Sequence, residues 1–556
     1  MDPLWILLAG VVIVVGGILW LKLHAFLALL LGALVVALLT PAAAVERVGL
    51  EEAAGEIVSV DLENREALLR PSKRQTLVAG SVLQVIPRSS TEPVATLEAV
   101  APVPDSKLWR ARFDEPTAPI QAGDLAVEPT ARQAAKTRSR QVVAERIAAE
   151  FGRTCAGIGI LVALAAIVGE TLLVTGAADR IVRSTLRLLG EPRAPLAFLS
   201  SGYLLGIPVF FDTVFYLLIP LGKAMRLRTG RNYLLYVLTI IAGATMTHSL
   251  VPPTPGPLAV AQQLGVDLGL MILGGMGVGA VTAVFGLCYA TWLNARVDVP
   301  LRGSVDASLE DLEKLSARED SQLPPLGLSL APIVLPVLLI SGKTVWTTVV
   351  GNAPSGTTLA QWQSIVMFLG DQNIAIGLAA AIGLAMLVFK HGANRREMAV
   401  SIEKALASGA VIILITAAGG AFGGMLRETG IGGRIKELSL AWQISGVWVL
   451  GVAFLVTVLI RTAQGSATVA MITSAGILGS AFSAEELAFH PMYLALVIGC
   501  GSKPFLWMND SGFWVMTKLS GFTEEESMKY VMPMTAGMGF VGAAVTILAA
   551  HLWPLV

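Results

Sequence analysis

Charged residues are scarce in this chain of 556 residues, and their scarcity excludes most classes of soluble protein. Asp, Glu, Lys and Arg make up 14% of the sequence, whereas a soluble domain carries roughly 25%. Hydrophobic residues make up 54%. The formal net charge is zero, so it indicates no partner of either sign, and we expect no nucleic-acid partner. The composition predicts a polytopic, all-α membrane protein surrounded by lipid.

Cysteine is also scarce, which excludes a disulfide framework and a paired metal-ligand motif. The three cysteines, Cys155, Cys288 and Cys500, lie in or next to apolar segments and are expected to act as small buried hydrophobes. The sequence also lacks a phosphate-binding loop and a zinc-type His/Glu cluster. We therefore expect no cofactor, no enzymatic activity and no direct use of ATP.

Long apolar segments dominate the rest of the chain. Segments that reach the length of about 20 residues needed to span a bilayer fall near 4–20, 25–42, 154–175, 232–252, 268–293, 326–348, 367–389, 405–426, 491–508 and 531–550. Two further apolar stretches, 195–222 and 444–474, carry polar residues at their centres. The first contains Asp212 in IPVFFDTVFY, and the second contains IRTAQGSATVA, which begins at Ile460.

Basic residues flank 195–222 on both sides, and basic loops usually lie in the cytoplasm. This pattern predicts a re-entrant hairpin, although an ordinary spanning helix with one atypical loop is the alternative. The same scheme makes the basic loops at 22–24 and 390–396 cytoplasmic and the acidic loop 475–490 external. It also puts the basic segment 129–153 outside, against the usual rule, but long loops translocate largely regardless of charge.

Two stretches of the chain match each other. GETLLVTGAADRI begins at Gly169 and GGMLRETGIGGRI at Gly423, an offset of 254 residues, and six of their thirteen positions are identical. At this offset Asp212 corresponds to Ser466, and the sequence TPGPLAV corresponds to MNDSGFW. Because the first hairpin should open inside and the second outside, we predict two inverted repeats, each with a re-entrant hairpin and a broken helix.

The repeat and the composition together predict the domain organisation. Residues 47–128 contain short β-type runs punctuated by Gly, Pro and Asp, which indicates a small inserted all-β soluble domain. The expected units are 1–46, two transmembrane helices; 47–128, the β-rich domain; 129–153, an amphipathic linker helix; 154–295, the first transport repeat; 296–404, a cytoplasmic loop and connecting transmembrane helices; and 405–556, the second transport repeat.

The helix break at THSLVPPTPGPLAVA, residues 247–261, indicates a binding site. Proline breaks a helix, and an irregular backbone at membrane depth is tolerated where it lines a cavity. A broken helix also presents unpaired N–H groups and the positive end of a helix dipole, both of which attract an anion. Breaks from both repeats should therefore meet at a site for an anionic substrate.

Three stretches carry a resemblance to a known family. THSLVPPTPGPLAVA, RTAQGSATVAMIT and MNDSGFW resemble signature sequences of the gluconate permease family, which belongs to a larger group of ion transporters with paired hairpins. The resemblance covers about 1–45 and 140–556 and implies proton symport of gluconate or a related sugar acid. Two positions depart from it. Asp212 stands where a glutamate is expected, and Lys503 replaces a residue that is usually apolar.

The candidate site follows from the breaks and the polar hairpin centres. Substrate-binding candidates are Asp212, Thr213, His248, Thr254, Gly256, Arg461, Gln464, Gly465, Ser466, Thr468, Asn509, Asp510 and Ser511. Asp212, His248 and Asp510 are candidate proton carriers, because ionisable groups inside a membrane are costly and usually functional. Lys503 is expected to tune the substrate or to pair with an acid.

Each candidate also has a structural interpretation. Asp212 could be the permanent partner of Lys503, and His248 a neutral group that hydrogen-bonds the broken backbone. Asp510 could cap a helix, and Arg461 could lie at a membrane edge or a helix terminus.

We therefore predict a secondary active transporter in a bacterial-type inner membrane that imports a small hydroxylated monocarboxylate with protons. Sodium coupling is the alternative within transport, since broken helices also coordinate Na⁺. A membrane sensor that uses an extracytoplasmic β-rich domain is the alternative from another class. A homodimer is also expected.

Overall fold

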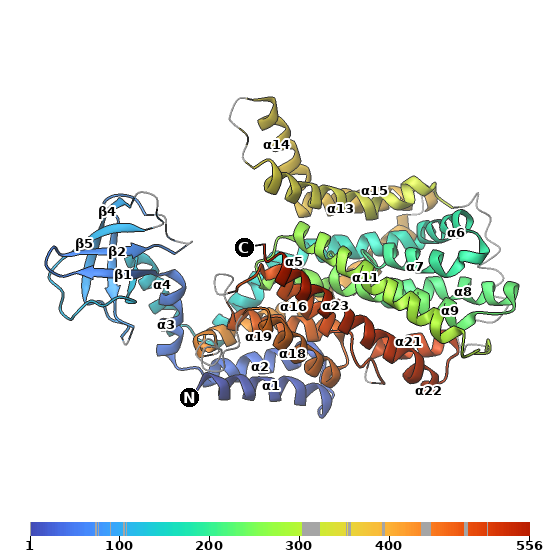
Figure 1. The fold of residues 1–556 in the computed structure, drawn as a ribbon, viewed down its shortest axis with the longest axis horizontal. Coiled ribbons are helices and arrows are strands. Elements are labelled where there is room, and N and C mark those ends of the chain that lie inside the picture. Colours follow the sequence, from blue (N-terminus) through green and yellow to red (C-terminus); the bar gives the residue numbers. More distant parts are fainter. Residues whose placement is uncertain are drawn as a thin grey trace.

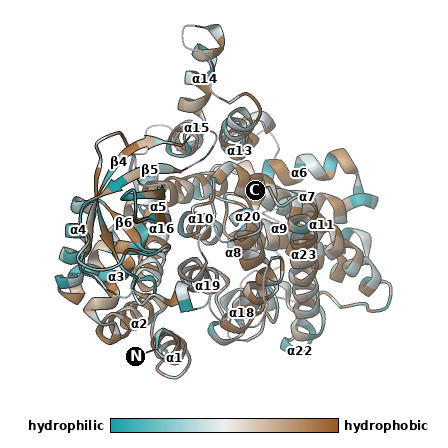
Figure 2. Cartoon of the chain, turned by 60° about the vertical axis from the view of Figure 1, so that its left-hand side comes forward, coloured by the Kyte–Doolittle hydropathy of each residue, from teal (hydrophilic) through white to brown (hydrophobic). Residues whose placement is uncertain are grey.

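The structure is a computed structural model. It describes residues 2–555 apart from 73–74, 76, 89, 104–105, 107, 303–322, 352, 354–356, 392–394, 435–445, 483–486 and 509. The described residues form a long bundle of helices with a small β-barrel at one end (Figure 1). Hydrophobic residues run along the helices of the bundle, whereas hydrophilic residues gather on α3, α4 and parts of the barrel (Figure 2).

The chain begins with two apolar helices, α1 (Pro3–Leu19) and α2 (Ala25–Leu39), which pack against each other. Asp2 fixes the start of α1, because its side chain accepts a hydrogen bond of 2.9 Å from the Leu4 N–H. The backbone then bends by 99° into α3 (Ala42–Ala53), which leads to the barrel.

The barrel has six antiparallel strands closed in the order β1-β2-β5-β4-β3-β6. They are β1 (Gly55–Asp61), β2 (Glu66–Arg70), β3 (Val82–Ile86), β4 (Ala95–Pro102), β5 (Trp109–Phe113) and β6 (Leu125–Val127). Alternate apolar side chains, among them Ile57, Leu83 and Leu97, fill the interior. The barrel begins at Gly55, later than the boundary expected at residue 47, because 47–53 belong to α3.

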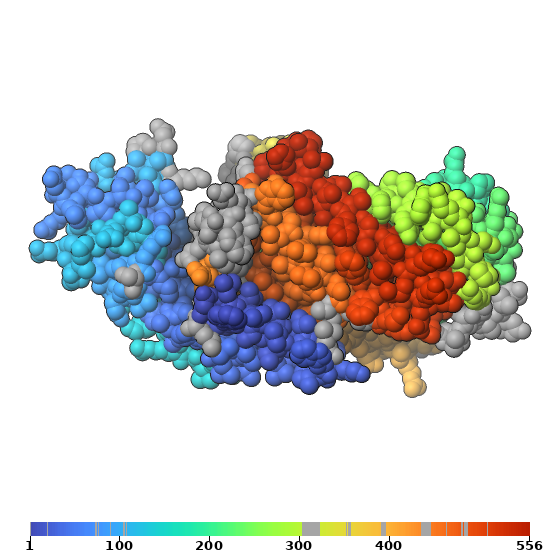
Figure 3. All heavy atoms as spheres, turned by 60° about the horizontal axis from the view of Figure 1, so that its bottom comes forward, coloured from blue at the N-terminus to red at the C-terminus, as the bar shows by residue number. Residues whose placement is uncertain are grey.

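We predicted a single linker helix over 129–153, and this prediction is wrong. It contains α4 (Pro129–Arg140) and the first residues of α5 (Val143–Val174), with a break at Gln141 and Val142. Helix α4 packs on α3, and Figure 3 shows the barrel projecting from the body of helices. Glu428, just beyond the end of α16, accepts hydrogen bonds from Arg138 of α4 at 2.9 Å and Arg146 of α5 at 2.6 Å.

The first half of the bundle continues from α5 through shorter elements. These are α6 (Ala177–Leu189), η1 (Glu191–Arg193), α7 (Ala194–Leu205), α8 (Phe211–Thr229), α9 (Tyr233–Leu250), α10 (Pro255–Gln263) and α11 (Leu268–Asn294). Five residues separate α7 from α8, and four residues, Val251–Thr254, separate α9 from α10. The first of these breaks lies just before Asp212, and the second contains Pro252 and Pro253.

Three connecting helices follow: α13 (Leu326–Val349), α14 (Thr358–Leu369) and α15 (Gln372–His391). The second half then contains α16 (Arg395–Arg427), α18 (Trp448–Gln464), α19 (Ala467–Ala481), α20 (Pro491–Gly501), α21 (Ser511–Ser520), α22 (Glu524–Glu526), η3 (Ser527–Val531) and α23 (Met532–Leu552). Only Gly465 and Ser466 separate α18 from α19, and residues 502–510 separate α20 from α21. The apolar segment expected at 491–508 therefore ends as a helix at Gly501.

Packing brings the two halves together. Helix α5 runs along α16, α10 packs on α19, α11 on α23, and α21 on α8. Within the described residues, seven helices are long and apolar enough to cross a membrane, or eight if the bent pair α2 and α3 is one span. They are Val143–Val174, Tyr233–Gln263, Leu268–Asn294, Leu326–Val349, Gln372–Lys390, Arg396–Arg427 and Glu524–Leu552. The protein is thus a mostly helical, multi-pass membrane protein with an inserted β-barrel.

Candidate functional site

Four helices from the two halves begin at one cavity. This central cavity has a volume of about 290 Å³, close to the lower limit of about 300 Å³ for small-molecule sites. Its lining includes the first residues of each helix: Phe211 and Asp212 of α8, Pro255 of α10, Ala467 and Thr468 of α19, and Ser511 and Gly512 of α21. Each helix start carries a partial positive charge, so the cavity favours an anion.

Local sequence explains why the helices start there. Gly465 adopts a left-handed φ of 82°, which ends α18 and lets the chain reverse at once into α19. Ser466 then caps α19 by accepting a hydrogen bond from the Val469 N–H. In the first half, Pro255 occupies the first position of α10, where its missing N–H costs no hydrogen bond.

Arg461 is the most deeply buried charged side chain at the cavity, with 2% of its surface exposed. Its Nε donates a hydrogen bond of 2.9 Å to the backbone oxygen of Ser502, and its Nη2 pairs with the Asp510 carboxylate. Its Nη1 is buried and has no hydrogen-bond partner among the described residues. The guanidinium is therefore held in place with one donor unused, as recognition of a carboxylate requires.

Asp510 has two structural roles at once. One oxygen pairs with Arg461, and the other accepts a hydrogen bond of 2.5 Å from the Gly512 N–H at the start of α21. The sequence suggested either a helix cap or a role in the site, and the geometry contains both the cap and a position in the cavity lining.

Lys503 and Asp212 also line the cavity, and their charges are opposite. Lys503 is 8% exposed, and its ammonium makes no ion pair within 4 Å among the described residues. Asp212 likewise makes no hydrogen bond or ion pair there. The structural alternative of a permanent Asp212–Lys503 salt bridge therefore does not describe this conformation.

Gly512 determines how close the two carboxylates lie. A Cβ atom at this position would be 3.1 Å from Asp510 Oδ1 and 3.4 Å from Asp212 Oδ1, so the two oxygens lie within about 6.5 Å of each other. The absence of a side chain at Gly512 keeps the space between these two acids open.

Asp212 also lines a second, wider cavity of about 920 Å³. The two cavities share Phe210 and Asp212, so Asp212 lies at their junction. The lining of the wider cavity also includes three lysines and two acids: Lys223, Lys404, Lys518, Glu170 and Asp179. Asp212 is therefore accessible from both cavities.

His248 reaches the central cavity from the end of α9. Its ring lies edge-on to Phe210, with 6.1 Å between the ring centroids. Its Nδ1 atom is buried and has no hydrogen-bond partner among the described residues. The alternative of a neutral imidazole that hydrogen-bonds the broken backbone is therefore not supported at Nδ1 within the described part of the chain.

The remaining predicted residues divide between the cavity and its supports. Ser466, Thr468 and Ser511 line the central cavity, and Thr213 lines the wider one. Thr254 is buried and donates to the Val251 oxygen at 2.6 Å, while the amide of Gln464 is buried without a partner among the described residues. Asn509 lies outside the described residues.

Gly256 has a packing role. A Cβ atom there would be 2.0 Å from Met471 Cε, so this glycine allows α10 to approach α19. Gly256 was a substrate-binding candidate in the sequence, but it is not among the residues that line the central cavity.

Sequence reasoning missed several lining residues. They are Phe210, Phe211, Thr245, Ile412, Ile415, Ala467, Val469, Leu506, Gly512, Met516, Thr535 and Pro255. Thr245 and Thr535 add hydroxyl groups. Thr245 lies two residues before the polar run Thr247–Ser249, which could have indicated it, whereas Thr535 is a single threonine in an otherwise apolar run.

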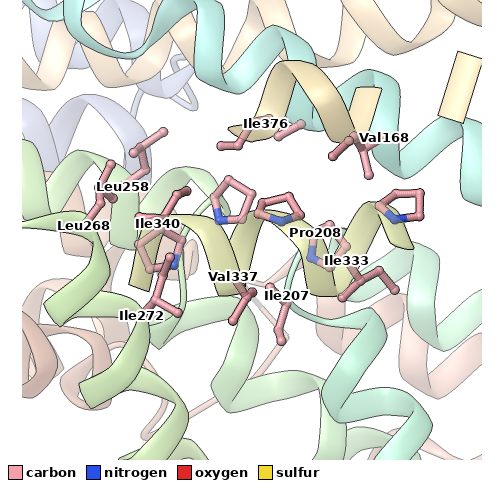
Figure 4. A pocket seen from close by; sticks show the side chains of 16 residues that line it. Val168, Ile207, Pro208, Leu258, Leu268, Ile272, Ile333, Val337, Ile340 and Ile376 are labelled. Carbon is pink, nitrogen blue, oxygen red and sulfur yellow. The ribbon is translucent and has the colours of Figure 1, made fainter. Parts of the chain in front are cut away.

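The proline-rich break has an apolar side that faces away from the central cavity. Pro252 and Pro253 line a small cavity of about 20 Å³ together with Pro332 and Pro336 of α13. Figure 4 shows the apolar side chains that surround it, including Ile207, Pro208 and Ile333. A space of this size holds about one water molecule, so its role is packing.

Comparison with known proteins identifies the family of this multi-pass membrane protein. The model of the GntP permease family matches residues 134–552, and the chain belongs to this family. It is therefore a permease and not an enzyme, as the sequence predicted. The resemblance noted in the sequence is confirmed, and the inserted β-barrel lies outside the matched region.

Individual relatives agree with this assignment. An uncharacterized permease of Haemophilus influenzae is 35% identical over 71% of this chain and 81% of its own length. A gluconate permease of Pseudomonas aeruginosa is 32% identical over 72% and 85%. A low-affinity gluconate transporter of Escherichia coli is 30% identical over 72% and 87%.

The fold also has a counterpart among solved structures. The crystal structure of the Alcanivorax borkumensis YdaH transporter matches with a TM-score of 0.50 and 13% identity, covering 79% of this chain and 94% of that one. At this identity the match concerns the fold alone.

Proposed function

We propose that this permease is a secondary active transporter that imports gluconate or a related small hydroxylated monocarboxylate by proton symport. The observation that carries the proposal is the convergence of four helix N-termini on one small cavity that also contains Arg461 and Lys503. Each N-terminus contributes the equivalent of roughly half a positive charge, so the site attracts a carboxylate strongly.

The neutral part of the lining suits a hydroxylated substrate. Hydroxyl groups of Ser466, Thr468 and Ser511 lie at helix starts, and those of Thr245 and Thr535 come from neighbouring helices. Such groups both donate and accept hydrogen bonds, as the hydroxyl groups of a sugar acid do. Relatives at 30–32% identity are named gluconate permeases or transporters, which supports this substrate class.

Two inverted repeats would provide the transport movement. The order of elements from α5 to α11 resembles that from α16 to α23, with one break before α8 and α19 and another before α10 and α21. We propose that α7–α8 and α18–α19 are re-entrant hairpins that open to opposite sides and move against the remaining helices. Asp212, at the junction of the two cavities, would carry the proton, with His248 and Asp510 as further candidates.

The proposed location is a bacterial-type inner membrane. The basic turn after α8, with Arg226, Arg228 and Arg231, would face the cytoplasm. Figure 1 shows the barrel at one end of the long axis and α6, α8 and α9 toward the other, which supports an extracytoplasmic barrel. Lipid and a second copy of the chain, in a homodimer, complete the proposed partners.

Uptake of labelled gluconate into proteoliposomes tests the proposal. The lumen should be alkaline and the outside acidic, with sodium either present or absent. Accumulation that requires the proton gradient and ignores sodium supports proton symport. Failure of folded, purified protein to take up gluconate or any of a panel of small hydroxy acids contradicts it.

Sodium coupling is the second candidate, and one observation favours it. The carboxylates of Asp212 and Asp510 lie within about 6.5 Å of each other, a separation that a cation between them would stabilise. Accumulation driven by a sodium gradient at equal pH on both sides would replace proton symport with sodium symport.

A further inference from the structure

Among the described residues, four charged side chains line the central cavity, and two of these four form an ion pair with each other. Arg461 pairs with Asp510, so these two charges cancel within the site. Lys503 and Asp212 remain, with opposite charges and no ion pair to any described residue within 4 Å. Lys503 and Asp212 are therefore each able to bind a charged group that enters the cavity.

Other ionisable groups surround Lys503 and Asp212. The charges of Arg461, Asp510 and Asp212 act on the Lys503 ammonium, and the Cys500 thiol also lies near it. His248 faces the same lysine from α9. On the side of the wider cavity, Asp212 shares its surroundings with Glu170 of α5, Asp179 of α6, Lys223 of α8, Lys404 of α16 and Lys518 of α21.

Counting charges shows which forms of the site can cross the membrane at low cost. With His248 neutral, the empty site with ionised Asp212 has no net charge. Protonation of Asp212 alone leaves a net charge of +1, and a bound monocarboxylate alone leaves −1. Both together restore zero. Because a net charge inside the bilayer is costly, the two neutral forms should move and the two charged forms should not.

We propose that Lys503 is a counter-ion shared in turn by the Asp212 carboxylate and the substrate carboxylate, which makes transport an electroneutral symport of one proton with one monocarboxylate. The inference rests on the proposed function and deepens it. A proton from the outside solution binds Asp212 and frees Lys503 for the substrate carboxylate. On the inner side the substrate leaves, the proton returns to solvent, and Lys503 again neutralises Asp212.

The dependence of uptake on membrane potential tests this directly in the wild-type protein. Proteoliposomes with a fixed pH gradient would be clamped by valinomycin and potassium at zero or at 100 mV, negative inside. An electroneutral carrier should accumulate gluconate equally at both potentials. A carrier that moves one net charge should change its accumulation ratio about 50-fold per 100 mV.

The outcomes separate the inference from the proposed function. Proton-driven uptake that responds to potential overturns the electroneutral scheme while proton symport stands. No gluconate transport at all overturns the proposed function itself.

Substitution of the lysine provides a second test. Lys503→Met should raise the KM for gluconate about tenfold to a hundredfold, the usual loss for a charge-assisted hydrogen bond. It should also move the pH dependence of gluconate counterflow to higher pH, because Asp212 would hold its proton more tightly without a neighbouring cation. Lys503→Arg should restore most of both properties.

The control is Lys529→Met, which removes an exposed lysine outside both cavities and should change neither property. A folded Lys503→Met protein with wild-type KM and an unchanged pH profile would rule out the shared counter-ion. If this variant does not fold, the potential measurement on the wild type still decides.

Discussion

The two helix breaks have a similar backbone plan but different chemistry. The break between α9 and α10 spans Val251–Thr254 and contains no charged residue. The break between α20 and α21 is longer, spans residues 502–510, and includes Lys503 and Asp510. The first break thus supplies a rigid, neutral helix start, whereas the second supplies charge.

This difference separates the contributions of the two halves to the central cavity. Both halves aim helix N-termini at the cavity, which gives a general attraction for anions. The second half adds Arg461, Lys503 and Asp510, while the first half adds Asp212 and His248. Under the proposed function, recognition of the carboxylate would depend mainly on the second half, and proton binding on the first.

Removing the central cation of the second half should have the largest effect. Arg461→Met leaves Asp510 buried without its partner, a change that costs about 3–5 kcal/mol in comparable pairs. We expect gluconate uptake to fall about 100-fold or more and the melting temperature to drop. Proteoliposome uptake and thermal unfolding in detergent measure the two effects.

The double variant Arg461→Met with Asp510→Asn is the matched control. It removes both charges together, so it should recover much of the stability without recovering uptake. Recovery of uptake would mean that Arg461 serves the fold alone.

Neutralising the acid of the first half should separate accumulation from binding. In Asp212→Asn the site keeps Lys503 and Arg461 but can no longer release a proton at this position. We expect pH-driven accumulation to disappear while counterflow of gluconate persists at a rate that no longer depends on pH. Normal accumulation by the variant would remove Asp212 from proton coupling.

Gly256 and Gly512 test the comparison between the two breaks, because each is the second residue of the helix that follows its break. Gly256→Ala in α10 would bring a methyl group against the buried Met471, and overpacking of this kind costs about 1–3 kcal/mol. Gly512→Ala in α21 would bring one between two carboxylates instead.

We therefore expect Gly256→Ala to lower the melting temperature with little change in KM, and Gly512→Ala to raise KM several-fold with little change in melting temperature. The same two assays, thermal unfolding and uptake kinetics, are applied to both variants. Identical behaviour of the pair would show that the two breaks are not specialised as described.

Removal of the barrel should have the smallest effect. Gly55 of β1 pairs with Ala126 of β6, so the two ends of the barrel meet and a short Gly-Ser linker can replace 55–127. Because α3 and α4 still pack together, we expect the shortened protein to fold and to transport at the wild-type rate. Loss of uptake in a folded protein would favour a sensor that controls transport through this domain.

Much of this organisation could be predicted from the sequence. Low charge and long apolar segments indicated a multi-pass membrane protein, and short β-type runs indicated the inserted barrel. Eight predicted site residues line the central cavity: Asp212, His248, Arg461, Ser466, Thr468, Lys503, Asp510 and Ser511. Polar residues stand out where the surrounding sequence is apolar, which is why these positions were recognisable.

Helix boundaries were predicted less well. The linker expected at 129–153 is divided at Gln141, and the apolar segment 491–508 leaves the helix at Gly501. Gln141 lies within a continuous polar stretch, so composition could not reveal the break there. After Gly501 the sequence does carry a stop signal, because Lys503 and Pro504 interrupt the apolar run.

The sequence by itself determined that the chain enters a membrane and which polar residues lie at the breaks, and it predicts that the two halves repeat. Only the tertiary structure decided how these residues are paired. Arg461 and Asp510 are 49 positions apart, and Asp212 lies in the other half of the chain. Packing between distant helices decides which charged side chains are paired and which are not. It also decides what Gly256 and Gly512 contact, so the two glycines differ in role.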